Sequence, residues 1–113
     1  MMKKNTLIIS LLIMLSSCVP TNMYYWGNYN VASYNHNKKK SEKTKADLFL
    51  VFEDIINNKN KGTRNTVPPG VYADYGFLLI MDGQEAKGRE MLENELLLYP
   101  ESIKMVEYIL NKL

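Results

Sequence analysis

Few of the residue types that carry out chemistry in proteins occur in this chain. Its 113 residues include one Cys, Cys18, and one His, His36. A single Cys cannot form an intramolecular disulfide, and together with one His it cannot complete a Cys/His zinc cage. The aspartates are scattered, Ser41 and Ser102 lack a nucleophile motif, and His36 stands alone in a polar stretch. We therefore expect no enzymatic activity, no catalytic residues, no cofactor and no metal site.

The thiol of Cys18 follows a segment that is typical of an export signal. Lys3 and Lys4 precede a largely apolar run at 7–15 and the small residues at 16–17. A positive start, a short apolar stretch and small residues are the parts of a signal peptide. The apolar run is shorter than the about 20 residues with which a helix crosses a bilayer. Residues 1–17 are therefore predicted to be a cleaved leader.

The motif Leu15-Ser16-Ser17-Cys18 resembles the lipobox of bacterial lipoproteins. In that class the Cys thiol receives a diacylglycerol, cleavage precedes the Cys, and its new amine is usually acylated. The resemblance implies lipidation of Cys18, a lipidated tether at 18–23, and a membrane anchor without a membrane span. Val19 replaces the Asp that commonly retains such proteins at the inner membrane, which favours the outer membrane, facing the periplasm. The alternative is an incidental thiol behind an ordinary signal peptide.

The charge balance gives no general case for a nucleic-acid partner. The chain has 14 basic and 12 acidic residues, and loss of Lys3 and Lys4 with the leader leaves 12 of each. The lysines at 38–45 suit anionic lipid head groups or an acidic partner, or else a solvated loop. The region 38–64 is basic and the C-terminal third acidic. This asymmetry would orient the protein between membrane and partner, or is ordinary helix surface.

Helical periodicity runs through residues 24–113, and no segment alternates convincingly as a strand does. Trp26, Tyr29 and Tyr34 share one face of a first helical segment. Ser41 is placed to cap a second helix over about 42–58. The apolar residues of that helix follow the spacing of a buried stripe: Leu48, Val51, Phe52 and Ile55.

A helix–turn–helix unit of 34 residues, the tetratricopeptide length, spans 69–102. Its first helix begins at Pro68-Pro69-Gly70, its second covers about 84–99, and a last helix covers about 101–112. The large and small residues resemble those of that repeat: Tyr72, Tyr75, Gly76, Leu79, Gly83, Gly88, Leu92 and Pro100. Gly76 and Gly88 would let the two helices approach closely.

The predicted fold is therefore all-α, with about two tetratricopeptide-like helical hairpins and a capping helix over 24–113. An imperfect earlier half-copy covers 26–58. Glu95 stands where the repeat usually has Ala, which predicts an exposed or looser end of the unit. A generic three-helix bundle is the alternative, and it preserves the all-α class.

Three segments together resemble a family of small bacterial lipoproteins whose shared domain has no known function: 24–29, 67–76 and 98–102. Genes of that family often neighbour a lipoprotein that resembles the curli secretion channel, and a third small lipoprotein. The resemblance implies an accessory part of an envelope assembly or export system, with other envelope lipoproteins as partners. It supplies no catalytic residues.

We therefore expect a non-catalytic interaction protein. Its partner would contact a groove beside the second hairpin or the aromatic segment 24–34, through these residues: Trp26, Tyr29, Tyr72, Tyr75 and Leu79. The alternative function is glycan or peptidoglycan binding, because the aromatic faces of 24–34 could stack on sugar rings. Packing of the same aromatics into the core competes with both.

Overall fold

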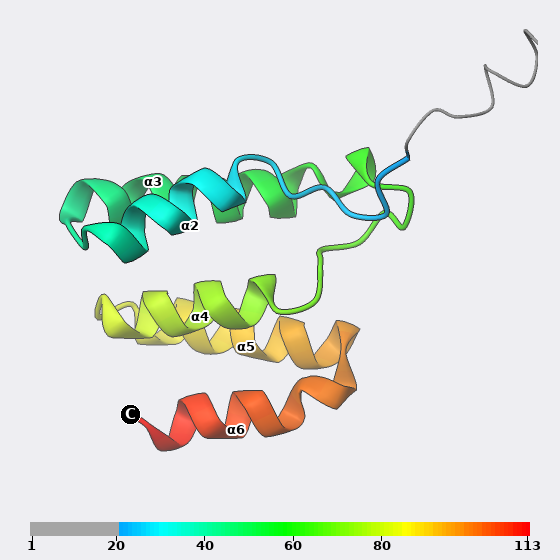
Figure 1. Ribbon diagram of the computed structural model, residues 1–113. Coiled ribbons are helices and arrows are strands. Elements are labelled where there is room, and N and C mark those ends of the chain that lie inside the picture. The colour runs from blue at the N-terminus through cyan, green and yellow to red at the C-terminus, as the bar shows by residue number, and fades with distance from the viewer. Residues whose placement is uncertain (1–20) are drawn as a thin grey trace, which may run out of the picture.

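The computed structural model describes residues 21–113, which form five α-helices and two short 3-10 turns (Figure 1). The helices are α2 (Tyr29–Lys38), α3 (Glu42–Asn57), α4 (Val71–Met81), α5 (Glu85–Leu98) and α6 (Ile103–Asn111), and the turns are η1 (Lys59–Lys61) and η2 (Pro100–Ser102). The predicted all-α class is confirmed, with hairpins α2–α3 and α4–α5 followed by α6. The predicted leader, Cys18 and the start of the tether lie outside the described residues.

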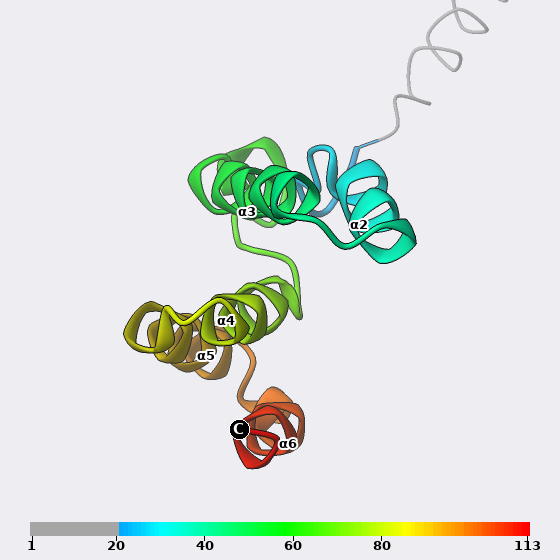
Figure 2. The same ribbon diagram turned by 90° about the vertical axis from the view of Figure 1, so that its left-hand side faces the viewer.

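The two hairpins and α6 stack in layers along one direction (Figures 1 and 2). Seen along the helix axes, α2 and α6 project to one side, with α4 set back between them, while α3 and α5 lie on the other side (Figure 2). The first helices of successive units therefore line a concave face, as stacking of repeated hairpins produces.

The helix α3 begins where the sequence places its cap. The Ser41 hydroxyl accepts a hydrogen bond from the Thr44 amide at 3.1 Å, and the Thr44 hydroxyl accepts one from the Ser41 amide at 3.0 Å. The Thr44 amide belongs to the first helical turn, whose amides have no intrahelical partners, and the Ser41 hydroxyl satisfies it. The Thr44 hydroxyl in turn satisfies the Ser41 amide.

Two helix starts differ from the sequence prediction. The helix α2 begins at Tyr29, so Trp26 precedes it, and Tyr34 is exposed on its surface. Pro68 and Pro69 precede α4 and do not form its first turn, because Gly70 adopts a φ of +90° immediately before Val71. That left-handed conformation favours glycine and redirects the chain into the helix.

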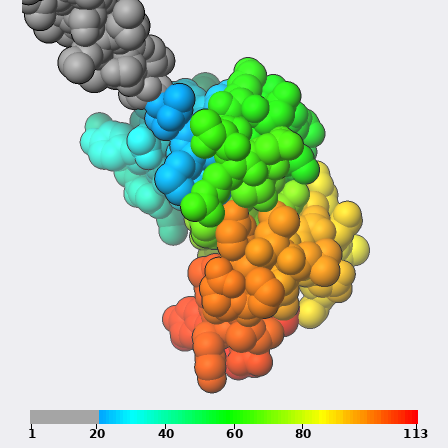
Figure 3. All heavy atoms as spheres, turned by 90° about the vertical axis from the view of Figure 1, so that its right-hand side faces the viewer, coloured from blue at the N-terminus to red at the C-terminus, as the bar shows by residue number. Residues whose placement is uncertain are grey.

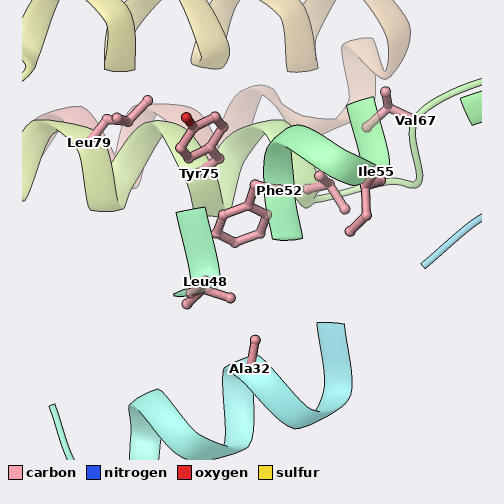
Figure 4. Close-up of a cluster of buried hydrophobic side chains, with 8 residues drawn as sticks. Ala32, Leu48, Phe52, Ile55, Val67, Tyr75 and Leu79 are labelled. Carbon is pink, nitrogen blue, oxygen red and sulfur yellow. The ribbon is translucent and has the colours of Figure 1, made fainter. Parts of the chain in front are cut away.

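One core cluster joins α2, α3 and α4 (Figure 4). The ring of Phe52 stacks on that of Tyr75 with centroids 5.1 Å apart. A second cluster joins α4, α5 and α6 through Ala73, Leu92 and Val106. Because α4 contributes to both clusters, it is the central element of the described fold.

The closest helix crossing lies between α4 and α5. A Cβ atom added to Gly76 would lie 2.7 Å from the carbonyl oxygen of Gly88, and one added to Gly88 would lie 2.6 Å from that of Gly76. Only residues without a Cβ allow the backbones to approach this closely. The predicted contact between these glycines is therefore confirmed.

The prediction of an exposed or looser end at Glu95 is wrong. Glu95 is fully buried, at 0% exposure. Its Oε1 accepts hydrogen bonds from the Gly70 amide at 2.9 Å and from the Ser102 hydroxyl at 3.0 Å. The side chain therefore ties α5 to the start of α4 and to η2.

We predict that Gly88→Ala destabilises the protein, because the new methyl group overpacks a crossing that has no room for it. The expected loss is about 1–3 kcal/mol in the free energy of unfolding, measured by denaturant titration. At an unconstrained helical site the same change would gain up to about 1 kcal/mol. Ala86→Leu, at an exposed position of the same helix, is the control and should change stability by no more than about 0.5 kcal/mol. A Gly88→Ala variant as stable as its parent would contradict the tight crossing.

Candidate functional site

Two pockets on the concave face form the halves of a groove whose floor is α4 and whose walls are α2 and α6. Asp74 and Phe77 on α4 line both halves of this groove. Spaced three residues apart, they share one face of the helix. The two halves of the groove therefore adjoin at these two residues.

The half of the groove beside α2 has a volume of about 270 Å³ and a mixed polar lining. Its wall carries Tyr29, His36 and Lys40, and its floor includes Phe52. The Nδ1 atom of His36 lies 3.1 Å from the Thr44 hydroxyl, which holds the ring against the start of α3. This half offers hydrogen-bonding groups and a positive charge.

The half beside α6 is larger, at about 460 Å³, and mostly apolar. Phe77, Met81, Met105 and Tyr108 line it, with Lys112 at its edge. Met81, Met105 and Tyr108 are all exposed. Flexible methionines and an exposed aromatic ring are typical of surfaces that adapt to a protein segment.

Asp74 is the acidic side chain on the groove floor. Its Oδ2 accepts a long hydrogen bond, 3.3 Å, from the Tyr29 hydroxyl. Desolvation by the surrounding protein raises the pKa of Asp74, although the bond from Tyr29 lowers it, and the negative charge of Glu95 raises it further. The residue nevertheless stays accessible from the open side of the groove. A raised pKa in a cleft makes Asp74 a candidate binding residue.

The five residues predicted to contact a partner do not lie on one surface in the structure. Tyr75 and Leu79 are 2% and 1% exposed, so they pack inside the core and offer no surface (Figure 4). Tyr72 is half-buried. Tyr29 lines the groove, whereas Trp26 packs on the ring of Tyr29 with centroids 5.5 Å apart and lies at the end of the hairpin.

The sequence reasoning missed the groove floor because it followed one stripe of α4. Asp74, Phe77 and Met81 form a second stripe beside the buried one. A helix that is apolar on several faces contacts more than one neighbour. The apolar residues around α4 were the signal that could have revealed this second face.

A second distinctive surface lies at the end of the α2–α3 hairpin where the described chain begins (Figure 3). The Tyr25 hydroxyl donates to Asp54 Oδ2 at 2.7 Å, and this bond is the main cause of a raised pKa of Tyr25. The Asn58 amide donates to Asp54 Oδ1 at 2.8 Å. Asp54 thus fastens the aromatic segment onto α3.

Two further properties concern residues 21–113 alone. Within this range no cluster of three His, Cys, Asp or Glu side chains is suited to hold a metal ion. Of the helices described there, none has the length and apolar character that a membrane crossing requires.

Comparison with known proteins gives a family. A family model described as a domain of unknown function, DUF4810, matches residues 23–109. The chain belongs to this family. No curated protein and no solved structure matches the chain. In this DUF4810 chain the matched range covers both hairpins and most of α6, so the groove, apart from Lys112 at its edge, lies within the shared domain.

We predict that Asp74→Asn raises the free energy of unfolding near neutral pH. Because the pKa of Asp74 is higher in the folded than in the unfolded chain, its ionised form disfavours folding, and this cost vanishes below the ordinary pKa. The gain over the parent should therefore shrink as the pH is lowered toward about 3.8. Asp47→Asn is the control, because exposed Asp47 pairs with Lys43 on α3. An Asp74→Asn variant no more stable than the parent at neutral pH would contradict the desolvation of Asp74.

Proposed function

We propose that this protein is a membrane-anchored lipoprotein of the bacterial cell envelope that binds a partner protein and has no catalytic role. The observation that carries the proposal is the pair of adjoining pockets beside α2, α4 and α6, one of them mostly apolar, which share the carboxylate-bearing residue Asp74. The resemblance to small lipoproteins near a curli-type channel suggests that the partner belongs to an envelope assembly or export system.

The chemistry of the groove specifies the partner segment. The exposed carboxylate of Asp74 on the groove floor favours a Lys or Arg side chain, whose positive charge would stabilise its ionised form. Phe77, Met81 and Met105 favour apolar side chains beside that residue. We therefore infer an amphipathic segment with one basic residue flanked by apolar ones.

The leader and Cys18 support the anchoring part of the proposal. Two or three acyl chains hold a protein stably at a bilayer, whereas one chain holds it only marginally. An anchor at the outer membrane, facing the periplasm, would raise the effective concentration of the groove near other anchored proteins. A modest intrinsic affinity would then be sufficient.

Photocrosslinking in cells tests the groove. We predict that a photoreactive residue at Phe77, Met81 or Tyr108 traps one reproducible envelope protein, because these side chains line the groove. Leu50 on α3 and Leu97 on α5 are matched controls, since both are exposed apolar residues on the other helices of the hairpins. Adducts that form equally from the control positions, or from none, would contradict binding in the groove. Adding Asp74→Ala to a crosslinking variant should weaken the specific adduct.

A separate prediction concerns the anchor. Cys18→Ser should leave an unprocessed precursor that takes up no labelled palmitate, because the thiol that accepts the lipid is absent. Gel mobility and metabolic labelling measure the two effects. Ser17→Ala is the control, because it keeps a small residue before the Cys and should be processed normally. Undiminished labelling of the Cys18→Ser variant would refute lipidation at this position.

A further inference from the structure

The path by which the chain enters the described fold is fixed by backbone contacts. The amides of Thr63 and Arg64 donate to the carbonyl oxygens of Asn22 and Met23 at 3.0 and 3.1 Å. Gly62 lies directly against this segment, so that an added Cβ atom would be 2.7 Å from the Met23 carbonyl oxygen. Residues 22–23, expected to belong to the tether, are thus paired to the loop after η1.

Basic and aromatic side chains surround this point. Lys59, Lys61 and Arg64 are exposed. The Lys61 ammonium lies 5.0 Å from the centroid of the Tyr25 ring, and the Arg64 guanidinium lies 5.9 Å from that of Tyr24. We call residues 21–26 and 59–64 together the anchor-end surface, which faces the viewer in the upper part of Figure 3.

Exposed apolar groups accompany these cations. Trp26 is 41% exposed although one face of its ring packs on Tyr29, and Met23 is also exposed. The acidic side chain packed against this surface, Asp54, is engaged by Tyr25 and Asn58. The anchor-end surface therefore presents positive charge and amphipathic rings to its surroundings.

The length of the intervening chain limits where this surface can lie. Only two residues separate Cys18 from Thr21 in the sequence. Fully extended, that connection spans at most about 11 Å. The Debye length, over which attraction between charges is effective, is about 8 Å at physiological ionic strength. Lys59, Lys61 and Arg64 would therefore lie within about this distance of a bilayer that holds Cys18, or close to it.

We propose that the anchor-end surface docks onto the phospholipid head groups of the membrane that holds Cys18. This inference rests on the proposed lipidation of Cys18. Lys and Arg are attracted to anionic lipids, and Trp and Tyr prefer the interface between head groups and acyl chains. The anchor-end surface lies at one end of the first hairpin, and α6 lies in the layer farthest from that hairpin (Figure 1).

Trp26 allows a direct test because it is the one tryptophan of the chain. The acylated protein, purified from membranes and verified by mass spectrometry, is reconstituted into vesicles of phosphatidylethanolamine and phosphatidylglycerol. Some of the lipid carries a nitroxide near the head group, which quenches nearby tryptophan fluorescence. We expect Trp26 to be quenched, and the quenching to decrease as salt is added.

Two matched variants make the test specific. Trp26→Phe combined with Tyr108→Trp moves the reporter to an exposed position on α6 and should show little quenching. Lys61→Gln with Arg64→Gln should reduce quenching of Trp26. Lys38→Gln with Lys39→Gln removes the same charge at the opposite end of the hairpin and should leave it unchanged (Figure 1).

Any other result contradicts the docking inference, and the pattern of results shows which step is wrong. If the protein is acylated and floats with the vesicles but Trp26 is not quenched, or both reporters are quenched equally, docking is refuted and the proposed groove function stands. Equal effects of the two charge-removing pairs would refute the role of Lys61 and Arg64. A purified chain without acyl groups refutes the anchor and the docking together. Protection of Trp26 from aqueous iodide by sacculi, with no quenching in vesicles, assigns the surface to glycan instead.

Discussion

The buried carboxylate of Glu95 holds together the part of the fold from which the groove is built. A buried carboxylate is costly unless hydrogen bonds compensate it. Here the Gly70 amide, at the positive N-terminal end of α4, and the Ser102 hydroxyl before α6 both donate to Oε1, whereas Oε2 is buried with no hydrogen-bond partner among the described residues. The Tyr99 hydroxyl adds a bond of 2.6 Å to the Val67 carbonyl oxygen. These hydrogen bonds thus fix the starts of α4 and α6 relative to α5. The two helices form the floor and one wall of the groove.

The glycine crossing and the Glu95 contacts each fix a different aspect of the position of α4. Gly76 and Gly88 set how closely α4 approaches α5, whereas Glu95 sets where α4 begins along it. On its α3 side, Tyr75 donates to Glu53, which also accepts from Lys87 of α5 at 3.0 Å. With neighbours on these sides, α4 leaves one open face, and Asp74, Phe77 and Met81 occupy it.

Local signals in the sequence were sufficient for the elements and for the α4–α5 crossing. Ser41 and Gly83 act within their own turns, and Gly76 and Gly88 meet because the two helices of one short hairpin pack at the spacing that the repeat pattern specifies. The burial of Glu95 could not be predicted in this way, because its partners lie 25 and 7 residues away in the chain. An isolated charge on a helix has the same local pattern whether it is solvated or bonded inside.

The same distinction explains why only part of the candidate site was predicted. Tyr75 and Leu79 form a regular helical stripe, and such a stripe marks burial without revealing which neighbour covers it. Trp26 precedes α2, so helical spacing did not apply to it, and backbone pairing of 22–23 with 63–64 fixed its position instead. The groove and the anchor-end surface therefore share the packing of Trp26 on Tyr29 and otherwise depend on different contacts. Changes at Phe77 or Met81 should leave the anchor end intact, because the contacts of 21–26 with α3, the loop after η1 and Tyr29 do not involve these two side chains.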